Sequence, residues 1–113
     1  MPDCIFCAIV AGAIPADTVA DTETTLAFRD VSPKAEIHVL VIPKKHYANL
    51  GEVAAADPTL VAATIATAAD VADRLGVTGR GYRLIANTGS GAGQTVFHAH
   101  LHLLAGEDLP GFS

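Results

Sequence analysis

The stretch VFHAHLHLL, residues 96–104, contains three histidines separated by single apolar residues. Side chains alternate between the two faces of a β-strand, so a strand here predicts His98, His100 and His102 on one face and the apolar residues, Phe97 among them, on the other. Same-face neighbours stand about 6.7 Å apart, which leaves the outer imidazoles about 13 Å from each other and disfavours one metal ion held by all three. We interpret the face with the histidines as part of a functional site. The alternative is an exposed polar face of a half-buried sheet.

Length and composition indicate one domain, residues 1–113, because 50% of its residues are hydrophobic and no linker divides it. The formal net charge is −5, with scattered Lys and Arg, which disfavours binding to nucleic-acid polymers or anionic membranes but allows a single nucleotide. No stretch approaches the roughly 20 apolar residues that span a bilayer, and the first residues do not read as a secretory signal. We therefore expect a cytoplasmic protein, in which Cys4 and Cys7 are thiols or metal ligands rather than a disulfide.

Hydrophobic patterns outside the histidine stretch predict several strands with helices inserted between them, rather than alternating βαβ units. Residues 4–11 favour a short helix, and residues 24–29, 37–42 and 82–86 favour strands. One long helix is predicted from its N-cap Asp57 and from Pro58 to its end at Gly76. Its apolar stripe is Val61, Ile65, Ala68, Ala72 and Leu75. Antiparallel strands with inserted helices indicate the α+β class.

The glycine-rich segment NTGSGAGQ, residues 87–94, raises the question of phosphate binding. Glycines let backbone N–H groups approach an anion, but nucleotide-binding loops of the Walker and Rossmann types continue into a helix. This loop continues into the histidine stretch instead. A flexible hairpin connection is the alternative, yet any phosphate held here would lie beside the imidazoles.

The stretch FHAHLHLL resembles the signature of the histidine triad, or HIT, superfamily of nucleotide hydrolases and transferases, in which three histidines alternate with apolar residues. The chain is similar to the Hint branch over CIFCAIVAGAIPA, LAFRDVSPKAEIHVLVIPKKH and GYRLIANTGSGAGQTVFHAHLHLLAG. The resemblance implies a HIT-like fold with about five antiparallel strands, one long helix and a short N-terminal helix, paired into a homodimer. It also implies hydrolysis or transfer at the α-phosphate of purine nucleoside phosphoramidates or related nucleotide conjugates, with release of a nucleoside monophosphate such as AMP.

The same resemblance assigns roles to histidines. It makes His100 the nucleophile that becomes transiently nucleotidylated, His38 a residue that helps to orient it, and His102 a hydrogen-bond donor to phosphate. Covalent catalysis by histidine needs one ring nitrogen free while a partner fixes the tautomer through the other. The alternatives are that His38 is a strand-face histidine and that His102 is merely exposed.

Substrate contacts follow from the resemblance as well. Asp30 resembles the acceptor of the ribose hydroxyls, although a turn residue before Ser32-Pro33 is the alternative. Phe28 and Val31 would line the base pocket. Contacts on the phosphate side are assigned to Asn87, the backbone at Gly93, Gln94 and Thr95.

The Cys4-x-x-Cys7 pair is expected to bind zinc. Some bacterial HIT proteins join two such cysteines to the histidine of a PKxH segment and to the first triad histidine, which implies the set Cys4, Cys7, His46 and His98. Two thiolates and two imidazoles suit a closed, structural zinc site, and no cofactor is required for the chemistry itself. Two thiols packed in the core are the alternative.

Two departures and two rival functions stay open. Thr95 stands where many members have serine, and the tail GEDLPGFS lacks the tryptophan of some relatives, which leaves the leaving group undetermined. One rival is a cupin-like metal site with His98 and His100 as ligands, although the long helix fits it poorly. The other is a nucleotide-binding sensor or scaffold dimer with little turnover.

Overall fold

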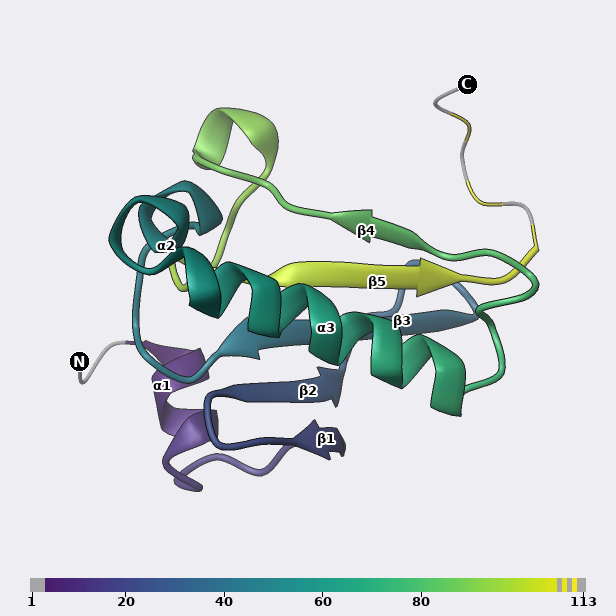
Figure 1. Ribbon diagram of the computed structural model, residues 1–113, viewed down its shortest axis with the longest axis horizontal. Helices are drawn as coiled ribbons and strands as arrows, with labels where there is room; N and C mark the ends of the chain where they lie inside the picture. Colours follow the sequence, from purple (N-terminus) through teal and green to yellow (C-terminus); the bar gives the residue numbers. More distant parts are fainter. Residues whose placement is uncertain (1–3, 108, 110, 112–113) are drawn as a thin grey trace.

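One antiparallel sheet organises the protein, whose computed structural model describes residues 4–107, 109 and 111. The strand order is β1-β2-β3-β5-β4 (Figure 1). The strands are β1 (Thr18–Asp21), β2 (Thr25–Arg29), β3 (Ile37–Pro43), β4 (Arg83–Ile85) and β5 (Leu101–Ala105). The helices are α1 (Ile5–Val10), α2 (Leu50–Ala56) and α3 (Pro58–Arg74), with a 3₁₀ turn at Ser90–Ala92. The predicted α+β class with five antiparallel strands, one long helix and a short N-terminal helix is confirmed.

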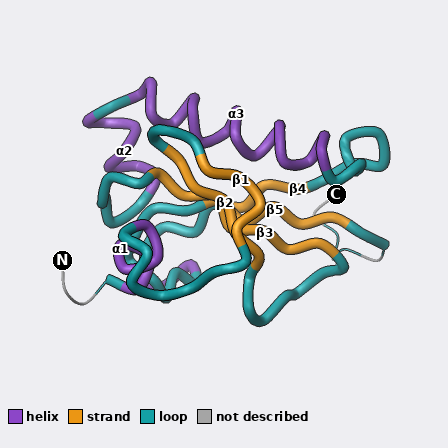
Figure 2. Tube along the Cα trace, turned by 90° about the horizontal axis from the view of Figure 1, so that it is seen from below, coloured by secondary structure: helices purple, strands orange, loops and turns teal. Residues whose placement is uncertain are grey.

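Helices α3 and α1 lie on opposite faces of the sheet (Figure 2). Along the central strand β3, Val39 and Val41 pack in the cluster that includes α3, whereas Leu40 and Ile42 pack with α1. This alternation follows from the two-residue period of a strand. Both faces of β3 are therefore covered, which explains its nearly continuous apolar sequence. None of the helices in the described part of the chain is long and apolar enough to cross a membrane.

The long helix begins as predicted, with the Asp57 side chain accepting a hydrogen bond from the Leu60 amide. The predicted apolar stripe is partly wrong, because Ile65 is 45% exposed while Thr64 and Thr67 are buried. Each threonine hydroxyl donates to the carbonyl four residues earlier, and the Thr67 hydroxyl also bonds that of Thr25 at 2.7 Å. Satisfied hydroxyls can be buried, so the buried face is shifted from the one that apolar residues alone predict.

The prediction of one strand through all three triad histidines is wrong. Strand β5 begins at Leu101, so of the three only His102 lies within it. The preceding segment contacts the chain after β3 instead of pairing with β3 itself, because the Ala99 amide donates to the Tyr47 carbonyl at 2.7 Å. Phe97, expected on the core face, is 51% exposed.

Strand β1 and helix α2 were not indicated by the sequence patterns. Strand β1 has four residues and an irregular register with β2, so its apolar alternation is too short to detect. Helix α2 has seven residues and a single buried one, Val53, and it is stabilised at its start by the Asn49 side chain. The tail GEDLPGFS, residues 106–113, lies partly outside the described residues.

Candidate active site and metal cluster

A cavity of about 1050 Å³ lies on the face of the sheet that carries α1. It brings together residues from α1, β2, β3, β5 and the glycine-rich loop. Its lining contains all three histidines expected in catalysis and six further residues expected to contact substrate: His38, His100, His102, Phe28, Asp30, Val31, Asn87, Gly93 and Thr95. The volume is that of a pocket for a drug-sized ligand, which includes a mononucleotide.

The His100 ring is fixed through one nitrogen. Its Nδ1 lies 2.7 Å from the carbonyl oxygen of His98, and a carbonyl can only accept, so Nδ1 carries the proton. In the neutral ring, Nε2 then keeps its lone pair. His100 is 8% exposed and lines the cavity, so this lone pair belongs to a nearly buried imidazole at the cavity wall.

A hydrogen-bond chain fixes the other two histidines. The Lys34 amide donates to His38 Nδ1 at 3.0 Å, which leaves the proton of neutral His38 on Nε2. That proton is donated to His102 Nδ1 at 2.9 Å. His102 therefore carries its own proton on Nε2, where it is available as a donor. The partner of His38 is thus His102, whereas the partner of His100 is a backbone carbonyl.

Burial keeps these two imidazoles neutral. It lowers the pKa of His38, with Lys34 adding to the shift and Asp30 opposing it. Burial also lowers the pKa of His102 to about 4, and neighbouring His100 and His38 contribute. Both rings are consequently uncharged near pH 7, as the hydrogen-bond chain requires.

We expect the free energy of unfolding to fall as the pH is lowered from 6.5 toward 4. In this window an unfolded chain, with an ordinary histidine pKa near 6.5, binds a proton that folded His102 does not. One such proton gives a slope of at most about 1.4 kcal/mol per pH unit, reduced by the partial exposure of the ring. Urea unfolding of wild type and His102→Gln at pH 4.5, 5.5 and 6.5 should show the steeper loss in wild type. An equal pH dependence of the free energy of unfolding in the two proteins would contradict the lowered pKa of His102.

Asp30, His38 and His102 also place possible ligand atoms within 4.8 Å of one another. A cation bound to His38 Nε2 would displace its proton to Nδ1, where it would face the donating Lys34 amide. The hydrogen bonds therefore favour a proton-bearing chain over a metal site here. Asp30 has the turn role considered for it, because one carboxylate oxygen accepts from the Ser32 amide. Its other carboxylate oxygen lies 3.4 Å from His38 Nε2.

Gln94 is the expected substrate contact that does not line the cavity. Its side chain is 3% exposed, accepts from the Gly89 amide and donates to the carbonyls of Ala48 and Val96. These bonds fasten the glycine-rich loop to the chain before α2. Positive φ angles of 85° at Gly89 and 93° at Gly93 explain why glycine occurs at both ends of its 3₁₀ turn. The Gly93 amide itself donates to Ser90, so a phosphate would have to share it.

Phe6 is a site residue that the sequence reasoning missed. Its ring meets His98, His100 and Phe28 edge-on, with centroids 5.9, 5.3 and 5.4 Å away. It is 6% exposed and lines the cavity. The sequence signal for Phe6 is its position between the two cysteines predicted to bind metal.

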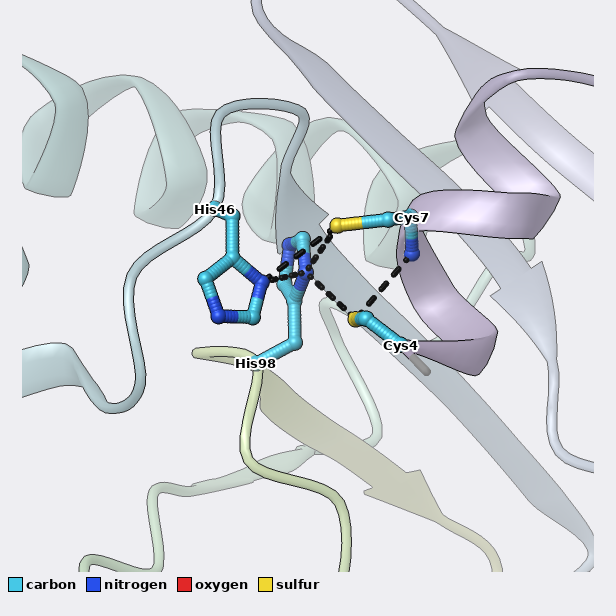
Figure 3. A group of neighbouring side chains, drawn as sticks. All are labelled: Cys4, Cys7, His46 and His98. Carbon is cyan, nitrogen blue, oxygen red and sulfur yellow. Dashed lines mark hydrogen bonds between the residues drawn. The ribbon is translucent and has the colours of Figure 1, made fainter. Parts of the chain in front are cut away.

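The four predicted metal ligands converge in a second site beside the cavity (Figure 3). Helix α1 and the residue before it supply Cys7 and Cys4, the segment after β3 supplies His46, and the segment before β5 supplies His98. The ligand atoms of all four lie within 4.8 Å of one another, and this cluster could hold a metal ion.

The separations within the cluster fit a tetrahedral centre. With zinc bond lengths, such a centre places two nitrogens about 3.3 Å apart and sulfur about 3.6 Å from nitrogen. The Nδ1 atoms of His46 and His98 are 3.2 Å apart, and three of the four sulfur–nitrogen pairs are 3.3 to 3.5 Å apart. His98 Nε2 donates to the Pro43 carbonyl at 2.7 Å, which leaves its Nδ1 lone pair facing the cluster.

Burial raises the pKa of the Cys7 thiol, and the neighbouring Cys4 adds to the shift. A cation that binds here would have to displace the thiol protons, so metal affinity should increase with pH. A smaller cavity of about 420 Å³, lined by Cys4 and His46 among others, gives solvent access to the cluster.

Known proteins resemble this chain in sequence and in fold. The family model described as HIT domain matches residues 11–109, so the two cysteines precede the matched region. The chain is 47% identical to an uncharacterised HIT-like protein of Synechococcus elongatus, covering 95% of this chain and 93% of that protein. It is 40% identical to the purine nucleoside phosphoramidase of Escherichia coli, covering 93% and 88%. A HIT family hydrolase from Clostridium thermocellum superposes with a TM-score of 0.94 at 40% identity, covering 100% and 99%.

Proposed function

The chain belongs to the HIT family, and we propose from this premise that it hydrolyses or transfers purine nucleoside phosphoramidates or related nucleotide conjugates at the α-phosphate. The observation that carries the proposal is the fixed tautomer of His100, which leaves Nε2 unprotonated at the cavity wall. The 40% identity to a purine nucleoside phosphoramidase favours this substrate class. The apolar end of the cavity, with Phe6, Ile9 and Phe28, suits a nucleobase.

The proposed reaction has two steps. First, the lone pair of His100 Nε2 forms a bond to the α-phosphorus, and the bond to the amine or phosphate breaks with its electron pair leaving on that group, which takes up a proton. Water then attacks the phosphorus of the nucleotidyl-histidine and releases a proton to the solvent, which balances the proton taken up in the first step. The phosphorus–nitrogen bond breaks with its electron pair returning to His100 Nε2, and AMP or another nucleoside monophosphate departs. His102 Nε2–H donates to a phosphate oxygen as charge develops, and His38 holds His102 in that tautomer. In this proposal neither step requires a metal ion.

In the same proposal Asp30 accepts hydrogen bonds from the ribose hydroxyls, and Val31, which is 97% exposed, covers the base. Asn87 and Thr95 contact phosphate oxygens from the loop side of the cavity. Gln94 acts on the phosphate indirectly, because its side chain is committed to holding the loop.

We propose zinc as the ion of the Cys4, Cys7, His46 and His98 cluster. Two thiolates and two imidazoles at tetrahedral spacing are the donor set that zinc prefers, and four protein ligands close the site. In the cytoplasm, where we place the protein, the cysteines stay reduced and able to bind.

Turnover and binding measured together test the function. We expect adenosine 5′-phosphoramidate to yield AMP, which chromatography detects. We also expect added AMP to raise the melting temperature of the protein. Stabilisation by AMP without turnover would support a nucleotide sensor or scaffold instead. The absence of both turnover and stabilisation by AMP would contradict a nucleotide-related function.

We also propose a homodimer, because half of this small chain is hydrophobic and large apolar side chains such as Ile65 and Phe97 stay exposed in the single chain. Light scattering at micromolar concentration should give twice the chain mass of 11.6 kDa. A mass equal to one chain would refute the dimer.

A further inference from the structure

His98 takes part in both sites through different atoms. Its ring Nδ1 lies in the metal cluster, 3.4 Å from Cys4 Sγ and 3.2 Å from His46 Nδ1. Its backbone carbonyl accepts the Nδ1 proton of His100 at 2.7 Å. A cation that fixes the His98 ring therefore also restrains the peptide group that holds the nucleophile.

Two other ligand-bearing segments reach the same peptide. The Tyr47 carbonyl, one residue after His46, accepts from the Ala99 amide at 2.7 Å. Phe6, between the two cysteines, packs edge-on against His100 with centroids 5.3 Å apart. Each of the three segments that supply a ligand thus contacts residues 98–100 directly or contains them.

These contacts need a common anchor, because helix α1 has only six residues and the 94–100 segment lies outside any strand. Short helices and irregular segments have little stability of their own. A cation joined to Cys4, Cys7, His46 and His98 would fasten three such segments at one point.

We propose that the metal cluster is a positioning device for the nucleophile: with zinc bound, it holds the His98 carbonyl where it keeps His100 in the Nδ1–H tautomer. The inference rests on the proposed function for its kinetic consequence, but the tautomer can be observed without any turnover. A metal that merely stabilised the fold would leave the tautomer and the turnover of folded protein unchanged.

The test compares wild type with His46→Gln, which removes a ligand outside the nucleotide cavity, and with wild type stripped by a chelator through the smaller cavity. The control is Val77→Ala, which destabilises the core on the α3 face, across the sheet from α1. We measure kcat and KM for adenosine 5′-phosphoramidate well below the melting temperatures, the Kd for AMP, and the His100 ring tautomer by ¹⁵N NMR at one fixed pH.

Metal-free wild type and His46→Gln should lose about 10- to 100-fold in kcat, the usual range for lost support around a metal site. The Kd for AMP should change less than about threefold, and the His100 signals should move from one tautomer to an exchanging mixture. Zinc returned to stripped wild type should restore both readouts, and Val77→Ala should alter neither. An unchanged tautomer after metal loss, or a wild type that keeps one tautomer while containing no zinc, would overturn the inference. If neither wild type nor any variant turns over the phosphoramidate, the proposed function fails. The measured His100 tautomer with and without zinc then still tests the inference.

Discussion

Replacement of His100 by alanine is expected to reduce turnover of adenosine 5′-phosphoramidate by about 10³-fold or more, while AMP still binds. The substitution removes Nε2, the atom proposed to form the bond to phosphorus, and loss of a covalent nucleophile commonly costs several orders of magnitude. The groups proposed to bind the ribose and phosphate, Asp30, Asn87 and Thr95, are retained in the cavity wall. Steady-state kinetics and calorimetric titration with AMP measure the two quantities separately.

His102→Ala serves as the matched comparison, because it truncates a neighbouring imidazole of the same cavity, with ring centroids 5.0 Å from His100. It removes a donor to phosphate rather than the atom that forms the bond, so we expect a loss of about 10²- to 10³-fold. Turnover near the wild-type level in His100→Ala, or a larger loss in His102→Ala, would reverse the roles assigned to these histidines.

Loss of the metal ligands is expected to have the largest effect on stability. A site filled at 1,000 times its Kd stabilises the folded chain by about 4 kcal/mol, which is roughly 15 °C in melting temperature for a domain of this size. Wild type purified without affinity metals should contain one zinc ion per chain. The double variant Cys4→Ser, Cys7→Ser should contain none and melt correspondingly lower, as followed by elemental analysis and calorimetry.

Ile5→Ala is the control for this comparison, since Ile5 is 49% exposed on the same helix and supplies no ligand. It should retain zinc and most of the thermal stability. Wild type that contains no metal, or a double variant that melts like wild type, would contradict the zinc proposal.

The sequence was most informative where a short pattern had one physical interpretation. Asp57 and Pro58 predicted the start of α3, and the apolar run from Ile37 predicted β3, because a helix cap and an apolar run are each visible within a few consecutive residues. The period of two predicted that His100 and His102 lie near each other, and their ring centroids are 5.0 Å apart although only His102 lies in a strand.

Features that depend on distant partners could not be predicted in this way. Residues 97–100 alternate like a strand, but the Ala99 amide and the Gln94 side chain just before this segment bond to the chain after β3 and hold the segment apart from the sheet. The metal ligands come from three separate segments, so spacing alone did not join Cys4 to His98, and the resemblance to HIT proteins was needed. Phe6 was missed because an apolar residue in a short helix carries no sign of the aromatic contacts that it makes.

The central claim is that His100 becomes covalently nucleotidylated, and mass spectrometry of the quenched reaction tests it most directly. Enzyme mixed with adenosine 5′-phosphoramidate is quenched within milliseconds under conditions that preserve phosphoramidates, digested, and the peptide containing VFHAHLHLL is fragmented. We predict an added AMP mass on His100 that appears before free AMP accumulates and is absent from His100→Ala. AMP production at full rate without an adduct at any quench time, or an adduct on His98 or His102, would contradict the account.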